Sequence, residues 1–269
     1  MPAFSRAIRP EQLAWVWRQL HIAYIPKSMT PPKLRIASIA TFSADTDVKS
    51  LIPNAAARRR MSRLIKMGVA TGLECLAKGG GLTPDAVETA TGLGFLADSE
   101  KLLAQMATDG ESMMAPTPFM QSTFNTIGSQ LAIMTGCMGQ NMTFSHMYGS
   151  FGAALVDSAM LAESGEARNI LVVAADELTP TLDKMLTRMG LRRRGIEPSE
   201  GAVAMLLTTD DAAPRLGTIE DVETTNTTAP TEPQDYRYPT AAAERMAQMI
   251  LNKVGGTFEA AGVRCKLSF

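Results

Sequence analysis

The run from Asn169 to Ala175, NILVVAA, constrains the fold of this chain more than any other segment. It is almost wholly apolar, contains β-branched side chains, and follows Gly165, which ends an alanine-rich helical stretch. Strands without alternation of apolar and polar residues are typical of sheets that helices cover on both faces. The run therefore predicts a buried strand in a helix-covered sheet.

Strand and helix signals alternate along the chain on either side of this run. Leu34 to Phe42 and Ala202 to Thr208 have the composition of strands, and Arg58 to Lys78 carries apolar residues at helical spacing before three glycines. The alternation continues with a glycine-broken strand at Thr89 to Ala97, a helix at Ser99 to Met106, helices at Ser122 to Met134 and Phe151 to Ser164, and a strand at Asn141 to Ser145. This order predicts an α/β layered domain.

The pattern changes after residue 210. Glu220 to Tyr238 is rich in threonine, proline and acidic residues and predicts a surface excursion, before a last helix at about Thr240 to Val254. We therefore divide the 269 residues into an N-terminal extension (1–33), a core domain (34–210) and an irregular segment with a C-terminal helix (211–269).

Composition narrows the classes of function. The net charge of -1 gives no global field that favours nucleic acid, so we expect no nucleic-acid partner. The longest apolar runs, about ten residues, are too short to span a bilayer, and Met1 to Leu20 lacks the continuous apolar core of a signal peptide. The three widely spaced cysteines argue against a disulfide framework or a zinc site. We expect a cytoplasmic protein without a metal or cofactor.

Three stretches in a fixed order carry a resemblance to a known family. They are PTPFMQSTFNTIGSQLAIMTGCMGQN (Pro116 to Asn141), GSFGAALVDSAMLAESGEARNILVVAADE (Gly149 to Glu177) and EGAVAMLL (Glu200 to Leu207). With them, the chain from about Arg58 to Thr209 resembles the N-terminal half of the β-ketoacyl-acyl-carrier-protein synthases of the thiolase superfamily. It looks closer still to a short, chain-length-factor-like branch of aryl-polyene or flexirubin-type pathways. The resemblance implies a thiolase-like layered half-fold, mostly one βαβαβαββ unit, with the C-terminal half missing.

The resemblance also locates the catalytic position, which is altered in this chain. Active members carry a nucleophilic cysteine at the N-terminus of the helix after the third strand, where the helix dipole lowers its pKa. Tyr148 occupies that position, and a phenol is a poor acyl carrier compared with a thiolate. The family's two catalytic histidines come from the C-terminal half, and neither His21 nor His146 matches them. Although the chain resembles acyltransferases, we expect no condensing activity from it alone.

A subunit of this kind can act through a partner. In thiolase-fold dimers the third strand, here about Asn141 to Ser145, pairs across a two-fold axis, and each subunit shapes its neighbour's acyl tunnel. The resemblance therefore implies a non-catalytic chain-length factor that pairs with a catalytic ketosynthase and works with acyl carrier protein in fatty-acid, polyketide or aryl-polyene elongation. The candidate residues of the tunnel and dimer interface are Phe119, Met120, Asn125, Thr143, His146 and Tyr148.

Two arginine clusters are candidates for docking an acidic carrier protein, although a solvated surface is the plainer interpretation of each. They are Arg58, Arg59, Arg60 and Arg63, and Arg192, Arg193 and Arg194. Two other functions stay open. One is a small active acyltransferase or thioesterase that uses Cys137 or Ser145, although free cysteines are more often small buried hydrophobes. The other is a non-enzymatic scaffold that docks the carrier protein.

Overall fold

The computed structural model describes residues 33–110 and 116–269. The predicted N-terminal extension up to residue 32, which includes His21, lies outside the described residues. Within the described part of the chain, no helix is long and apolar enough to cross a membrane.

The first five strands form the predicted βαβαβαββ unit. They are β1 (Leu34–Thr41), β2 (Ala86–Ala90), β3 (Asn141–Phe144), β4 (Asn169–Asp176) and β5 (Gly201–Thr208). Their order in the sheet is β3-β2-β4-β5-β1, with β2 parallel to β3 and β4, and with β5 antiparallel to β4 and β1. β4 contains the NILVVAA run and is buried along almost its whole length, which confirms the prediction of a buried strand.

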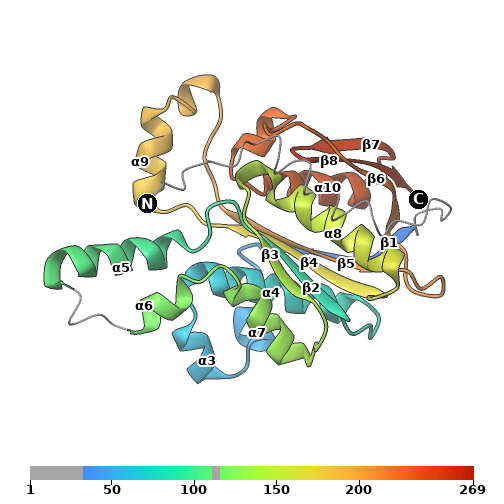
Figure 1. Ribbon diagram of the computed structural model, residues 1–269, viewed down its shortest axis with the longest axis horizontal. Helices are drawn as coiled ribbons and strands as arrows, with labels where there is room; N and C mark the ends of the chain where they lie inside the picture. Colours follow the sequence, from blue (N-terminus) through green and yellow to red (C-terminus); the bar gives the residue numbers. More distant parts are fainter. Residues whose placement is uncertain (1–32, 111–115) are drawn as a thin grey trace, which may run out of the picture. The chain divides into compact units, whose positions relative to one another are not determined.

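Helices cover both faces of this sheet (Figure 1). The longer ones are α4 (Arg63–Lys78) and α7 (Thr126–Thr135) on one face, and α8 (Ser150–Ser164) and α10 (Ala241–Leu251) on the other. Alternate residues of β4 serve the two cores, because successive side chains of a strand point to opposite faces. Leu171 and Val173 pack with α4 and α7, whereas Ile170 and Val172 pack with α8 and α10.

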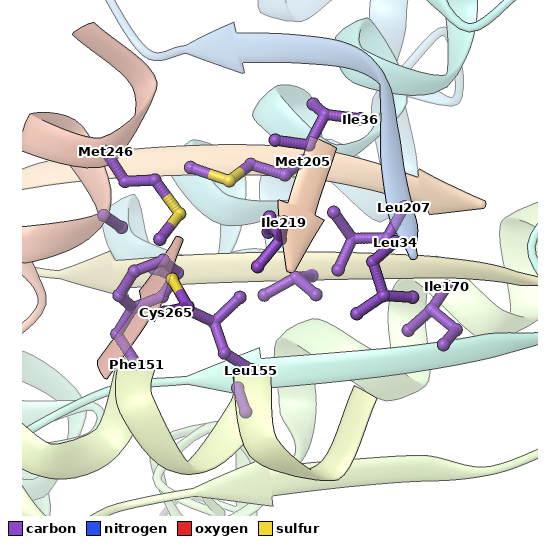
Figure 2. Close-up of a cluster of buried hydrophobic side chains, with 14 of the residues drawn as sticks. Leu34, Ile36, Phe151, Leu155, Ile170, Met205, Leu207, Ile219, Met246 and Cys265 are labelled. Carbon is purple, nitrogen blue, oxygen red and sulfur yellow. The ribbon is translucent and has the colours of Figure 1, made fainter. Parts of the chain in front are cut away.

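The core beneath α8 and α10 is shown in Figure 2. Phe151 and Leu155 of α8 point toward the strands, and Met246 of α10 reaches the same cluster. The rings of Phe151 and Phe258 meet edge to face, with centroids 6.4 Å apart. This packing fixes α8, and with it the turn that precedes α8, against the sheet.

Shorter elements connect the sheet and its helices. They are α2 (Val48–Leu51), α3 (Ala55–Arg60), α5 (Leu96–Asp109), α6 (Pro116–Gln121), α9 (Pro180–Arg188), and the 3-10 turns η2 (Met147–Gly149), η3 (Arg192–Arg194) and η4 (Pro233–Tyr236). β2 ends at Ala90, so the predicted strand over Thr89 to Ala97 is wrong beyond its start. Gly94, with a φ of 68°, belongs to the loop that leads into α5.

The part after residue 210 contains more regular structure than an irregular segment and a helix. β6 (Gly217–Thr224), β7 (Gly256–Ala260) and β8 (Val263–Ser268) extend the sheet beyond β1 in the order β6-β8-β7. That prediction is therefore wrong for these three strands. Threonine and acidic side chains line the exposed half of β6, and such residues are typical of loops. In β8, buried and exposed residues alternate, a strand signal that the sequence does contain.

The pairing of these strands repeats part of the first unit. β6 pairs with β8, and β8 with β7, all antiparallel, as β1 pairs with β5 and β5 with β4. Within the described residues no counterpart of β2 or β3 follows, so no second βαβαβαββ unit forms and β7 ends the sheet. The carbonyl of Glu259 in β7 accepts hydrogen bonds from the Thr231 hydroxyl at 2.7 Å and the Arg245 guanidinium at 2.6 Å.

Candidate functional site

The turn between β3 and α8 positions Tyr148. Met147 has a φ of 51°, in the left-handed region that non-glycine residues seldom occupy. Buried Ser150 holds the turn, because its hydroxyl accepts a hydrogen bond from the N–H of His146 at 2.8 Å and lies 2.7 Å from the carbonyl oxygen of Met147. Tyr148 therefore lies in a sharp turn, held by hydrogen bonds, at the start of a long helix.

The phenol of Tyr148 is half-buried against a second tyrosine. The ring centroids of Tyr148 and Tyr236 lie 5.7 Å apart at an angle of 59°. Burial, and then the charges of Tyr236 and Asp176, raise the pKa of Tyr148 above its ordinary value of 10. A phenol of this kind is protonated at neutral pH and is a weak nucleophile.

A buried carboxyl group, Asp176, lies at the end of β4 beside this turn. One of its oxygens accepts hydrogen bonds from the N–H of Gly92 at 2.8 Å and the hydroxyl of Thr91 at 3.1 Å. The other accepts from the N–H and the hydroxyl of Thr240 at 3.0 and 2.8 Å. Burial raises the pKa of Asp176 to about 6, against the opposing effect of these donors. Asp176 thus ties the loop after β2 to the start of α10.

The segment before α10 closes over the same loop. A Cβ atom added to Gly92 would lie 1.9 Å from the Cβ of Pro239, so no side chain fits between the two backbones. Sequence reasoning placed Tyr236 in a surface excursion and assigned no role to Asp176, Pro239 or Thr240. The available signal was the pair of tyrosines in DYRYP, because large aromatic side chains in a polar segment indicate burial.

The other predicted tunnel residues lie on the β3 side of the molecule. The hydroxyl of Thr143 in β3 donates a hydrogen bond to the side-chain oxygen of Asn125, at the start of α7, at 2.8 Å. Phe119 and Met120 lie on α6, and their side chains are 59% and 66% exposed. Within the described residues, these two side chains do not enclose a tunnel.

β3 forms an edge of the sheet, because within the described residues it pairs with β2 alone. Large apolar side chains are exposed on β3 and on the neighbouring segments that flank it in sequence. They are Phe119, Met120, Phe124, Ile133, Met134, Met138, Met142 and Met147. Isolated exposed hydrophobes are ordinary, but a group of them beside an open strand edge is typical of an interface.

The two predicted arginine clusters are partly committed to internal contacts. Arg58 donates to the backbone carbonyl of Ile52, Arg63 pairs with Glu200, and Arg192 pairs with Asp183 at 2.8 Å. The remaining cations are exposed and form no salt bridge within the described residues. They are Arg59, Arg60, Arg193 and Arg194.

The alternative nucleophiles are placed differently from Tyr148. Cys137 is half-buried after α7, at the opposite end of β3 from the turn. Ser145 follows β3, and its hydroxyl donates to the carbonyl of Gly92 at 3.4 Å. His146 is exposed and contributes to a groove along α8. The structure therefore does not place Cys137 at the turn that holds Tyr148.

Comparison with known families gives one match that covers most of the chain. The family model described as "Beta-ketoacyl synthase, N-terminal domain" matches residues 36–258. No curated protein sequence matches the chain.

Solved structures with similar folds include components of synthase complexes. A chain of the ketosynthase ApeO in complex with its chain length factor ApeC from Xenorhabdus doucetiae has a TM-score of 0.59 and 19% identity, over 90% of this chain and 100% of that one. A chain of the ishigamide ketosynthase/chain length factor has a TM-score of 0.62 and 16% identity, over 72% and 67% of the two chains. A chain of the AntDE:AntF complex, a type II acyl-carrier protein with its ketosynthase, gives 0.63 and 16%, over 71% and 68%.

Proposed function

Because this chain belongs to the family of β-ketoacyl synthase N-terminal domains, we propose that it is a non-catalytic, chain-length-factor-like subunit. It pairs with an active β-ketoacyl synthase and limits the length of an acyl, polyketide or polyene chain built on acyl carrier protein. The partner performs the condensation.

The observation that carries this proposal is the state of the nucleophile position. The resemblance places Tyr148 at the position where active relatives carry a cysteine. Its ring lies 5.7 Å from that of Tyr236, and burial raises its pKa. A protonated phenol packed against a second ring fills space and does not accept an acyl group readily. A bulky side chain at this position would limit the length of an acyl tunnel. Protein interiors are closely packed, so the space that the side chain fills is not available to a further extension unit.

The edge of the sheet at β3 supports pairing with a second chain. The edge strand has backbone hydrogen-bonding groups open to a second strand, and apolar side chains are exposed around it. Strand pairing across an interface uses both backbone hydrogen bonds and the burial of apolar surface. Similar folds occur in complexes of a ketosynthase with its chain length factor.

The exposed arginines of the two clusters are available to dock an acyl carrier protein. Of the two arginine clusters, Arg59, Arg60, Arg193 and Arg194 keep exposed guanidinium groups for an acidic partner. A further similar fold occurs in a complex of an acyl-carrier protein with its ketosynthase.

Co-expression tests the proposal directly. The chain is produced with each ketosynthase from the same locus and the carrier protein, and product length is measured by mass spectrometry. Phe119→Ala and Tyr148→Ala should lengthen the product by at least one extension unit, whereas Met185→Ala on exposed α9 should not.

Three outcomes separate the competing functions. Absence of a complex with every ketosynthase would overturn the pairing. A complex that forms, and whose product length is unchanged by both substitutions, would favour a docking scaffold. Turnover of acyl thioesters by the purified chain, lost in Cys137→Ala or Ser145→Ala, would favour an independent enzyme.

A further inference from the structure

A groove runs along α8. Ala153, Val156 and Met160 form one wall, because residues three and four apart share a helix face, and the segment 224–228 forms the other. The cavity between the walls has a volume of about 580 Å³. One end of the groove reaches Phe144, where β3 ends.

The charge inside this groove is unbalanced. Asp157 is the one carboxylate among the described residues that line it, and neither lysine nor arginine is among them. None of the salt bridges within the described residues includes Asp157. His146, at the end near β3, is the other titratable group of the lining, and Glu166 beyond α8 adds negative charge near Asp157.

A second carboxyl group lies behind Asp157. Glu88 in β2 is fully buried, and one of its oxygens has no hydrogen-bond partner within the described residues. The amide of Gln140 donates to Asp157 and, at 3.3 Å, to the other oxygen of Glu88, and the two carboxyl groups also interact directly. Burial and then the charge of Asp157 raise the pKa of Glu88 to about 8, so the pair retains a proton at neutral pH.

We propose that this groove receives a lysine or arginine side chain of the ketosynthase partner, with its cationic group against Asp157 and its aliphatic stem along Ala153 and Met160. Long cationic side chains lay their stems on apolar surface in this way. The cation balances the charge of the carboxyl pair, and the groove opens beside β3, where the partner is proposed to pair. The inference therefore rests on the proposed function and names a specific contact within it.

The affinity of the complex tests this contact. Asp157→Asn should weaken binding of the purified ketosynthase roughly thirtyfold or more in isothermal titration calorimetry, since removing one member of a buried interfacial charge pair commonly costs that much. Glu166→Gln removes the same charge just beyond α8 and outside the groove lining, so its affinity should stay within about threefold of wild type. Ala153→Trp, which fills the groove, should also weaken binding, and melting temperatures confirm that each variant is folded.

The outcomes separate this contact from the pairing itself. A wild-type chain that binds no ketosynthase contradicts the proposed function. A complex that Asp157→Asn and Ala153→Trp weaken no more than Glu166→Gln does overturns the groove contact while the pairing stands. Hydrogen exchange should show greater protection of residues 153–160 and 224–228 in the complex than in the chain alone, where the hydrogen bonds of α8 already slow exchange. Protection that instead rises with the concentration of the chain alone would assign the groove to a second copy and overturn the ketosynthase as its occupant.

Discussion

Asp176 shows how a single residue joins distant parts of this chain. Its two oxygens hold the loop at Gly92 and the start of α10 at Thr240, sixty-four residues further along the sequence. The full burial of the carboxyl group disfavours its charged form, although four close donors favour it. The free energy of folding therefore depends on the protonation of this group.

The sign of that dependence follows from the raised pKa. The unfolded chain releases the Asp176 proton near pH 3.8, and the folded chain near pH 6, so the folded state binds more protons between these values. Stability contributed by this group is present below about pH 4 and is lost as the pH rises to about 6. Denaturation in urea at several pH values should show a shallower loss of stability in Asp176→Asn than in wild type.

The same substitution has a second effect at neutral pH. The side-chain amide introduced by Asp176→Asn directs its own N–H groups toward the N–H and hydroxyl donors that the carboxylate accepts from. This lowers the free energy of unfolding by about 1–3 kcal/mol. Asp45→Asn, at an exposed position, provides the control and should change neither stability nor its pH profile. Equal pH profiles for wild type and Asp176→Asn would contradict this account of Asp176.

At the scale of elements, α8 lies very close to the turn between β7 and β8. A Cβ atom at Gly152 would lie 2.5 Å from the carbonyl oxygen of Ala261, which belongs to the backbone and cannot rotate away. This contact joins α8, the helix that follows Tyr148, to the C-terminal strands β7 and β8. The position of α8 thus depends on strands that sequence reasoning missed.

Gly152→Ala should therefore destabilise the fold. Alanine gains about 1 kcal/mol of helix propensity over glycine, whereas the overlap costs about 1–3 kcal/mol, so a net loss of about 1 kcal/mol is expected. Gly149→Ala is the control without an overlap, because its nearest neighbour would be the Cβ of His146 at 3.7 Å; as the N-cap of α8 it gains no helix propensity from alanine. Urea denaturation measures both, and equal stability of the two variants would contradict the overlap.

The sequence predicted the elements whose signal is local. The buried run of β4 and the helical spacing of α4 need no knowledge of the rest of the chain. Tyr148 was located by resemblance alone, since its turn carries no periodic signal. The contacts of Tyr236 and Pro239 could not be predicted, because they join segments far apart in sequence and depend on how the segment before α10 packs against the loop after β2 and the turn before α8.

At the scale of the whole molecule, half of the large apolar side chains that are exposed among the described residues lie on β3 and on the segments that flank it in sequence. A monomer with such a surface associates with itself or with a partner. The chain expressed alone should therefore elute as oligomers in size-exclusion chromatography with light scattering, and co-expression with its ketosynthase should convert it to a defined complex.

Met142→Lys, in β3, should prevent that complex, because the charge would be buried in the interface. Met185→Lys changes an equally exposed methionine on α9 and should leave the complex intact. A complex that tolerates Met142→Lys as well as Met185→Lys would place the interface elsewhere.

The capped carbonyl of Glu259 has a consequence for assembly. One border of the sheet, β3, is open to another strand, whereas at the opposite border the side chains of Thr231 and Arg245 occupy an acceptor that an incoming strand would need. Within the described residues, strand addition is therefore hindered at β7 and favoured at β3. This difference between the two borders favours a closed pair of chains over a filament.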